Sequence, residues 1–230
     1  MGWEEIISDF GLIILTLLIP VVASFYVKYQ YGVKSKIMNM KGITGGEIAR
    51  MILDKNGLND VKVESIEGSL SDHYDPTKKV VNLSTDIYAN TSIASIAVSA
   101  HECGHAIQDK ENDTFMRLRS SLVPITNICS YAGYVAILIG VIATITNLVW
   151  VGIILMLVVL AFQLVTLPVE FGASNRALKE LDETYCIGAD EIKGCKSMLL
   201  AAALTYVASV ITLVLEILRL FLIARNSDDN

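Results

Sequence analysis

His101-Glu102-Cys103-Gly104-His105 is the stretch that decides how the chain is interpreted, because it contains two of only three histidines. On an α-helix this spacing places both imidazoles on one face, one turn apart. Two imidazole nitrogens make two corners of a tetrahedral Zn²⁺ site, and Glu102 beside them can accept a proton from a metal-bound water. The pattern is therefore typical of a metal-dependent hydrolase.

The composition indicates a membrane protein. Of the 230 residues, 53% are hydrophobic, whereas soluble domains average ~45–50% even with Gly counted. The net charge of −6 argues against a nucleic-acid partner, because no basic stripe is present to neutralise phosphates. The four cysteines, at positions 103, 129, 186 and 195, form no C-x-x-C pair and are interpreted as buried thiols.

The first apolar stretch, Ile6 to Val27, is long enough to cross a ~30 Å hydrocarbon core as a helix. Acidic rather than basic residues precede it, so we interpret it as a retained transmembrane helix and not as a cleaved signal peptide. Four lysines follow it, and by the positive-inside rule they mark the cytoplasmic side, which leaves the N-terminus outside. These lysines are Lys28, Lys34, Lys36 and Lys41.

Residues 41 to 112 have the character of a soluble domain. Thr44 and Glu47 form a capping box, which predicts a helix that ends near Gly57. Residues 61–66 alternate like a strand, and a turn at 74–77 precedes residues 79–83, which predicts a β-hairpin. An open edge of such a sheet can bind an extended peptide, although a hairpin that only packs is at least as consistent with the sequence. From Ser92 to Lys110 the apolar spacing predicts a largely buried helix that carries the histidine motif.

Two apolar stretches follow, about Leu122 to Thr146 and Leu148 to Leu167, and their short connection predicts an antiparallel transmembrane hairpin. Ala132, Ala136 and Gly140 provide a small face on which two helices can pack. Because two crossings return the chain to the side it left, the residues after Leu167 must lie on the same side of the membrane as the histidines. Residues 198–224 form the last apolar stretch, in which an ion pair of Glu216 with Arg219 is expected.

A catalytic zinc takes three protein ligands and a water, so the two histidines need a third donor. Glu170 can reach them once the hairpin has returned the chain. Glu111 occupies the place of the third ligand in an H-E-x-x-H-x-x-G-x-x-H pattern, but Gln108 replaces the glycine that would break the helix, so Glu111 is expected to point away. His73 is the remaining candidate.

Three motifs become informative when they are taken together. They are His101-Glu102-x-Gly104-His105-Ala106-x-Gln108, Ser71-Asp72-His73-Tyr74-Asp75-Pro76 and Leu167-Pro168-Val169-Glu170-Phe171-x-Ala173-Ser174. With the hydrophobic pattern of nearly the whole chain, they resemble the bacterial YugP-like family of membrane-bound neutral zinc metallopeptidases.

The Glu-Phe-x-Ala element is also similar to the third-ligand helix of gluzincin membrane proteases related to the Ste24 and HtpX enzymes. This resemblance implies Glu170 as the third ligand, with Ala173 packing under the site. The chain departs from those relatives at two positions. Ser174 stands where they have an acidic residue, and Gly172 stands where close relatives are expected to have one.

The expected reaction is peptide hydrolysis. Zn²⁺ held by His101, His105 and Glu170 activates a water, and Glu102 acts as the base. The developing oxyanion needs another donor, for which His73, Tyr74, Tyr185 and Arg176 are candidates. Arg176 is equally able to pair with Glu180, and His73 or Tyr74 can serve hairpin packing alone.

The expected fold is a mainly α membrane protein, with four transmembrane helices and a small α+β zincin-like catalytic unit. The expected division is a first transmembrane helix (1–27), a catalytic α+β region (28–121), a transmembrane hairpin (122–168), a third-ligand helix and loop (169–197) and a fourth transmembrane helix (198–224).

The expected protein lies in the cell membrane as a multi-pass zinc endopeptidase whose site faces the cytoplasm. Lys179, Lys193 and Lys196 support this orientation. Its expected partners are a peptide or membrane-protein substrate and the lipid bilayer. The alternative is an inactive zinc-binding scaffold or accessory protein, which would have no need of a carboxylate next to its first histidine.

Overall fold

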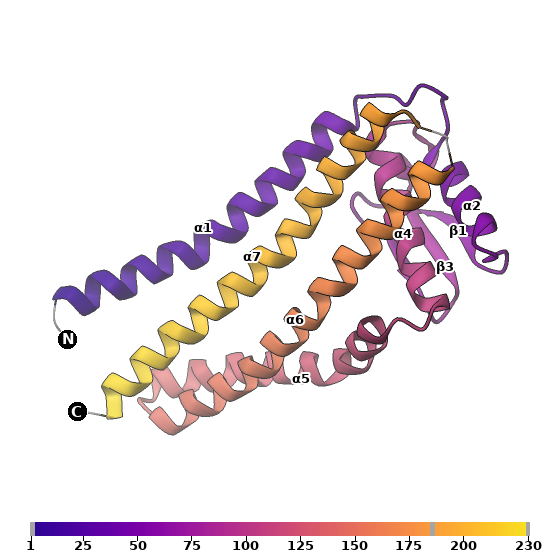
Figure 1. Ribbon diagram of the computed structural model, residues 1–230. Coiled ribbons are helices and arrows are strands. Elements are labelled where there is room, and N and C mark those ends of the chain that lie inside the picture. The colour runs from indigo at the N-terminus through magenta and orange to yellow at the C-terminus, as the bar shows by residue number, and fades with distance from the viewer. Residues whose placement is uncertain (1–2, 185–186, 229–230) are drawn as a thin grey trace. The chain divides into compact units, whose positions relative to one another are not determined.

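The computed structural model describes residues 3–184 and 187–228, which form seven helices and one three-stranded sheet (Figure 1). The elements are α1 (Trp3–Lys34), α2 (Gly45–Lys55), β1 (Lys62–Ile66), β2 (His73–Asp75), β3 (Val80–Ser84), α3 (Thr85–Ala89), α4 (Ile93–Lys110), α5 (Thr114–Ile142), α6 (Thr146–Glu183) and α7 (Ala189–Asp228). They divide into two compact units. The first comprises Met1–Ser24, Leu118–Leu167 and Thr205–Asn230, and the second comprises Phe25–Arg117 and Pro168–Leu204.

Four helices, α1, α5, α6 and α7, are long and apolar enough to cross a membrane, which confirms the predicted number. Helices α1, α6 and α7 extend beyond the apolar stretches that the sequence indicated at both ends, whereas α5 begins earlier than predicted and ends at Ile142, short of the predicted Thr146. Helix α6 has 38 residues and continues through Pro168, where the sequence analysis placed a boundary. At 1.5 Å per residue it is ~57 Å long, so only part of it can lie in a ~30 Å hydrocarbon core.

In the first unit, α5 and α6 pack through small residues. A side chain at Gly140 would meet the backbone nitrogen of Val149 at 2.9 Å, and one at Gly133 would meet Leu155 at 3.3 Å. The buried small positions of α5 are therefore Gly133, Ala136 and Gly140 rather than the predicted series that began at Ala132. Gly133 thus takes the place of Ala132 in the expected small-residue face. The reason for small residues there is unchanged, because the two helix backbones approach closely.

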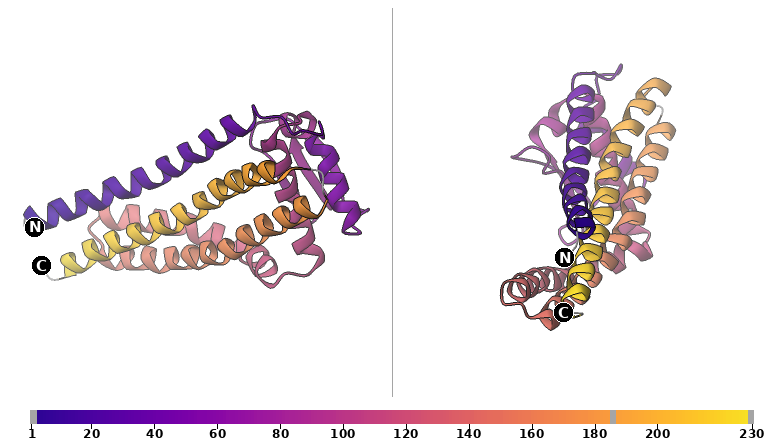
Figure 2. Two further views of the ribbon diagram at one scale, coloured as in Figure 1. Left: turned by 45° about the horizontal axis from the view of Figure 1, so that its top comes forward. Right: turned by 90° about the vertical axis from the view of Figure 1, so that its left-hand side faces the viewer.

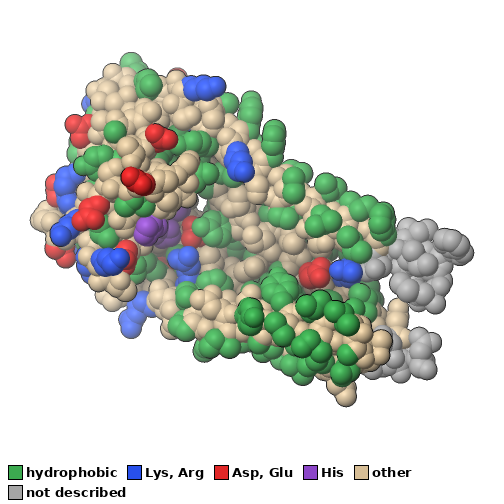
Figure 3. All heavy atoms as spheres, turned by 180° about the vertical axis from the view of Figure 1, so that it is seen from behind, with side chains coloured by type: hydrophobic (Ala, Val, Ile, Leu, Met, Phe, Trp, Pro, Cys, Tyr) green, Lys and Arg blue, Asp and Glu red, His purple; other side chains and the backbone are tan. Residues whose placement is uncertain are grey.

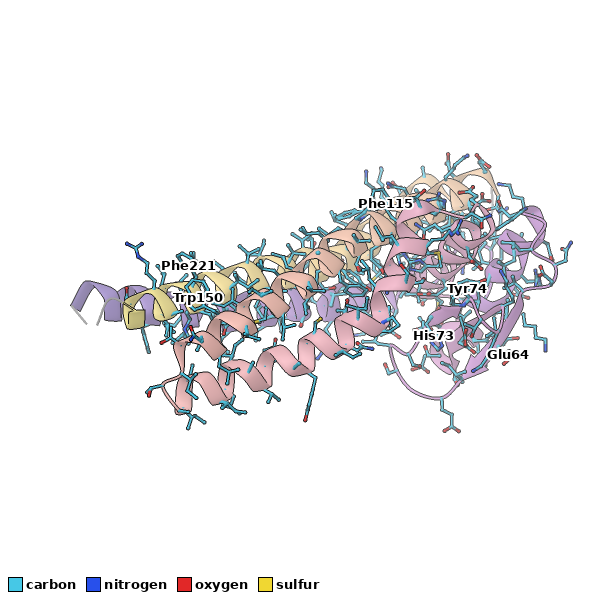
Figure 4. The ribbon with its side chains drawn as sticks, turned by 90° about the horizontal axis from the view of Figure 1, so that it is seen from below. Glu64, His73, Tyr74, Phe115, Trp150 and Phe221 are labelled. Carbon is cyan, nitrogen blue, oxygen red and sulfur yellow. The ribbon has the colours of Figure 1, made fainter. Side chains whose placement is uncertain are left out.

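Helix α7 carries the expected ion pair, with Arg219 Nη1 3.5 Å from Glu216 Oε1. Its Phe221 ring meets the ring of Trp150 on α6 edge to face, with centroids 5.5 Å apart, and both residues are labelled in Figure 4. This contact joins the two helices within the first unit.

In the second unit, helix α2 begins with the predicted capping box. The Thr44 hydroxyl accepts a hydrogen bond from the Glu47 backbone N–H at 3.2 Å, and the Glu47 carboxylate accepts one from the Thr44 N–H at 2.8 Å. Helix α4 matches the predicted range and is largely buried. Both helices pack against the strands (Figure 2). Of the described cysteines, Cys103 and Cys195 are buried as expected and Cys129 is only partly buried, whereas Cys186 lies outside the described residues.

The sheet differs from the predicted hairpin. Its strand order is β1-β3-β2, with β1 parallel to β3 and β2 antiparallel to it. The hairpin partner of β3 is therefore β2, which contains two of the residues that the sequence analysis assigned to the turn. The Asp75 carboxylate accepts hydrogen bonds from the backbone N–H of Thr77 and Lys78 at 2.9 and 3.2 Å, which fixes the tight turn after Asp75 and leaves β1 to pair on the other side of β3.

Candidate metal centre

His101, His105 and Glu170 offer three ligand atoms that all lie within 4.8 Å of one another. Glu170 Oε2 is 3.4 Å from His101 Nε2 and 3.7 Å from His105 Nε2. Ligands of a tetrahedral Zn²⁺ at 2.0–2.1 Å are separated from one another by ~3.3–3.4 Å. These two separations are close to that edge length, and a His₂Glu donor set is typical of a catalytic zinc, so these residues fit the ion.

Two helices of the second unit place the three donors. The i, i+4 spacing on α4 puts the two imidazoles on one face, with ring centroids 4.8 Å apart. Glu170 belongs to α6, which comes so close to α4 that a side chain at Gly104 would collide with the backbone carbonyl of Ala173. Gly104 therefore allows the approach on which the site depends.

The other nitrogen of each imidazole has a partner of its own. Ser174 Oγ lies 3.2 Å from His101 Nδ1, and Gln108 Oε1 lies 3.0 Å from His105 Nδ1. A proton on each Nδ1 leaves the Nε2 lone pair available to a metal. Ser174 thus lies beside His101 although it lacks the carboxylate that the related proteases have at this position. The Gln108 contact was missed at the sequence level, where only its i+3 spacing from His105 could have indicated it.

The site is shielded from solvent. Glu102 and His105 are each 8% exposed and Glu170 is 3% exposed. Burial alone would lower the pKa of the His105 imidazole, but the neighbouring Glu170 and Glu102 carboxylates raise it above its usual value. Glu102 itself forms no hydrogen bond or ion pair with any residue that the structure describes. A carboxylate that no other described side chain engages, and whose charge acts on His105, is therefore present beside the three donors.

His73 is not brought to this group. Adjacent strand residues point to opposite faces of a sheet, and His73 lies on the exposed face, with its Nε2 3.2 Å from the Asn82 amide nitrogen and its Nδ1 2.7 Å from the Ser71 carbonyl oxygen. Tyr74 lies on the buried face and donates its hydroxyl to Asp109 Oδ2 at 2.8 Å. Burial and this bond raise the pKa of Tyr74 well above its usual range, so the phenol stays neutral. Both residues are labelled in Figure 4.

Arg176 binds two acidic residues near the end of α4. Its Nε and Nη2 donate to Glu111 Oε2 at 3.1 and 2.7 Å, and its Nη2 is 3.4 Å from Asp113 Oδ2. Glu180, the alternative partner, instead lies 3.0 Å from Lys55 Nζ. Glu111 is outside the group of three donors, as the missing helix break predicts. The remaining candidate, Tyr185, lies outside the described residues.

Histidine is visible at the molecular surface in Figure 3, among acidic and basic groups. Of the two histidine donors, His101 has the more exposed side chain, at 15%.

Two histidines and a glutamate within reach of one ion, in a chain with four helices of membrane-spanning length, define a metal-binding membrane protein. Comparison with known proteins narrows this class. The chain belongs to the family described as "Putative neutral zinc metallopeptidase", whose model matches residues 10–225. It is 44% identical over 207 residues to the "Putative membrane protease YugP" of Bacillus subtilis (strain 168), an alignment that covers 90% of this chain and 92% of the relative. No solved structure matches it.

Family membership confirms the resemblance stated from the motifs. It also identifies zinc as the metal for which the His101, His105 and Glu170 group is suited.

Proposed function

We propose that the protein is an integral membrane zinc endopeptidase that hydrolyses peptide bonds at or near the cytoplasmic face of the membrane. The observation that carries this proposal is the Glu102 carboxylate, which directly follows His101 on α4, makes no side-chain hydrogen bond or ion pair with the described residues and helps to raise the pKa of His105. A carboxylate that no other side chain engages, beside a His₂Glu donor set, can act as the base for a metal-bound water. Membership in the zinc metallopeptidase family supports the same conclusion.

In this proposal His101, His105 and Glu170 hold the metal. When bound, zinc polarises the scissile carbonyl and lowers the pKa of a water molecule towards ~7. Glu102 takes a proton from the attacking water as the water oxygen bonds to the carbonyl carbon. Glu102 then gives that proton to the amide nitrogen as the carbon–nitrogen bond breaks, so the base is regenerated in each turnover.

Of the four candidates for the oxyanion donor, His73, Tyr74, Tyr185 and Arg176, we propose His73 and Arg176. In this conformation each is held by other residues, His73 by Ser71 and Asn82 and Arg176 by Glu111 and Asp113. Either would therefore have to exchange a partner before it could bind substrate. Two single variants, Arg176→Lys and His73→Asn, show which of the two is the oxyanion donor. Loss of that donor is expected to lower kcat by ~10²–10³ with little change in KM.

The second unit supports a zincin-like, more narrowly gluzincin-like, interpretation of the fold. A three-stranded sheet packs against the helix that carries the histidines, and its outer strands β1 and β2 leave edges at which an extended peptide can add as one more strand. We propose the division given above, with the catalytic region at 28–121 and the third-ligand helix and loop at 169–197. The lysines that follow the first span and precede the last one support a site that faces the cytoplasm.

Glu102→Gln tests the proposed function, because an amide keeps the shape of the side chain but cannot act as a base. The variant is expected to bind zinc at full stoichiometry, by elemental analysis, and to lose cleavage of an unfolded protein substrate. Glu67→Gln, at an exposed position outside the three strands, is the matched control and is expected to be fully active. Wild-type protein that binds zinc but cleaves nothing would favour the alternative, an inactive zinc-binding scaffold. In that case Ser174, which replaces the acidic residue of the related proteases, would be the first residue to test as the cause of the missing activity.

A further inference from the structure

Gln108 is the most completely buried polar residue next to the three donors, with no solvent exposure. A buried primary amide needs partners for both of its ends. Its Oε1 lies 3.0 Å from His105 Nδ1, and its Nε2 donates to the Val169 backbone carbonyl at 2.9 Å. The Gln108 side chain on α4 thus contacts His105, which is a proposed zinc ligand. It also contacts Val169 on α6, the residue that precedes the proposed ligand Glu170.

These two hydrogen bonds determine each other's direction. The Val169 carbonyl can only accept, so it must face the amide nitrogen of Gln108. The amide oxygen is then turned towards His105 and can only accept, which requires the proton on His105 Nδ1. This tautomer presents the Nε2 lone pair to the metal, because a neutral imidazole carries a single N–H.

Helix α6 is shaped to admit this amide. A Cβ at position 172 would come 2.8 Å from Gln108 Nε2 and 3.2 Å from Arg176 Nη1, so the Gln108 amide would have to shift away from its place beside Val169. Gly172 stands where an acidic residue was expected in close relatives. In this chain the absence of a side chain there gives Gln108 the room to reach Val169.

We propose that Gln108 is a positioning residue, which fixes the tautomer of His105 and holds Glu170 at its distance from that histidine through Val169. The inference rests on the proposed zinc site. It adds a function for a residue that touches neither metal nor substrate. The Nδ1 of His101 instead lies beside the Ser174 hydroxyl on α6. Among the residues that the structure describes, only Gln108 links a histidine of α4 to the backbone of α6 beside Glu170.

Two substitutions of Gln108 separate its two contacts. Gln108→Met keeps the length of the side chain and removes both hydrogen bonds. Gln108→Glu also loses the bond to Val169 but keeps an acceptor for His105 Nδ1. Gln163→Met is the matched control, because Gln163 lies on the same α6 as Glu170 and its buried Oε1 has no hydrogen-bond partner among the described residues.

The measurements are the zinc dissociation constant, by competition with a chromophoric chelator, and the visible absorption of the Co²⁺-substituted protein. Removing a hydrogen-bond partner of a metal-ligating histidine typically weakens metal binding 10–100-fold. Gln108→Met is therefore expected to weaken zinc binding by at least ~10-fold and to change the cobalt spectrum, whereas Gln163→Met leaves both unchanged. Gln108→Glu is expected to bind zinc more tightly than Gln108→Met.

Which of the two Gln108 variants binds zinc more tightly distinguishes a positioning role from a purely structural one. A purely structural role predicts that Gln108→Glu is the worse variant, because it introduces a buried charge that faces a carbonyl oxygen. Zinc binding in Gln108→Glu no tighter than in Gln108→Met, or wild-type affinity in Gln108→Met, would refute the proposal. Should the Gln108 variants fail to fold, Gly172→Ala tests the same contact from α6 and is expected to weaken zinc binding, and wild-type affinity there would equally refute it. Failure of the zinc site itself would appear in the wild-type protein, which would then bind no zinc.

Discussion

Glu111 Oε2 accepts hydrogen bonds from both Nε and Nη2 of Arg176, at 3.1 and 2.7 Å. The carboxylate that stands in the third-ligand position of a one-segment metal motif is therefore used to join the end of α4 to α6. Glu170, on the same helix as Arg176, is left beside the two histidines. The Arg176 pair and the proposed zinc site thus connect the same two helices at two places.

This arrangement predicts opposite results for two equivalent substitutions. Glu170→Gln removes the charge that helps to neutralise Zn²⁺, so zinc affinity should fall by at least ~10-fold, with hydrolysis falling alongside. Glu111→Gln should leave zinc affinity unchanged. Chelator competition on both purified variants is the measurement. Zinc binding that survives in the first variant and collapses in the second would move the third ligand to the segment that carries the histidines.

The two histidines should each be indispensable for zinc. His101→Ala or His105→Ala removes one of only three protein donors, and we expect zinc to fall from about one ion per chain to a trace. His73→Ala is the control, because His73 lies on the exposed face of the sheet and belongs to no group of three donors in the described part of the chain. Metal content by elemental analysis is the measurement. Full zinc content in His101→Ala or His105→Ala would refute the assignment of that histidine as a zinc ligand.

Gly104 should tolerate no side chain. A Cβ there would collide with the Ala173 backbone carbonyl, and backbone can yield only by moving α4 away from α6. We expect Gly104→Ala to lower the free energy of unfolding of the metal-free protein by ~1–3 kcal/mol and to weaken zinc binding as well. Gly32→Ala is the control, since a Cβ on Gly32 meets nothing within 4 Å. Equal thermal stability of the two variants would show that the helix contact is looser than the structure indicates.

The orientation in the membrane can be tested with cysteines in a variant that lacks the native ones. Asp60→Cys and Asp190→Cys lie at exposed positions of the second unit and should resist an impermeant thiol reagent in intact cells. Both should react once the membrane is permeabilised. Thr144→Cys, in the exposed connection between α5 and α6, should be labelled from outside and so controls for access. External labelling of position 60 or 190 would place the site on the other side.

Local patterns predicted local structure well. The Thr44 capping box, the range of α4 and the i+3 pair of Glu216 with Arg219 depend on residues within one or two helical turns, and each is present. Chain topology made Glu170 one candidate for the third ligand, because a two-helix hairpin must return the chain to its starting side, and the family resemblance then implied it over Glu111 and His73.

Contacts between distant segments could not be predicted in the same way. The parallel pairing of β1 with β3 and the bond from Gln108 to Val169 join residues whose proximity no local spacing encodes. Arg176 illustrates the difficulty. Its neighbour at i+4, Glu180, lies beside Lys55, whereas Arg176 pairs with Glu111 and Asp113. Pro168 misled for a related reason: proline usually ends a helix, yet α6 continues through it.

The proposed donors are separated in the chain by α5 and by the apolar first part of α6, with His101 and His105 before them and Glu170 further along α6. During synthesis the two histidines leave the ribosome first, and the glutamate follows only after both apolar stretches have been made. A site built from these three donors cannot form until the chain has been made as far as Glu170. A nascent chain that ends before Glu170 therefore lacks one of the three proposed zinc ligands and is unable to carry out the proposed hydrolysis.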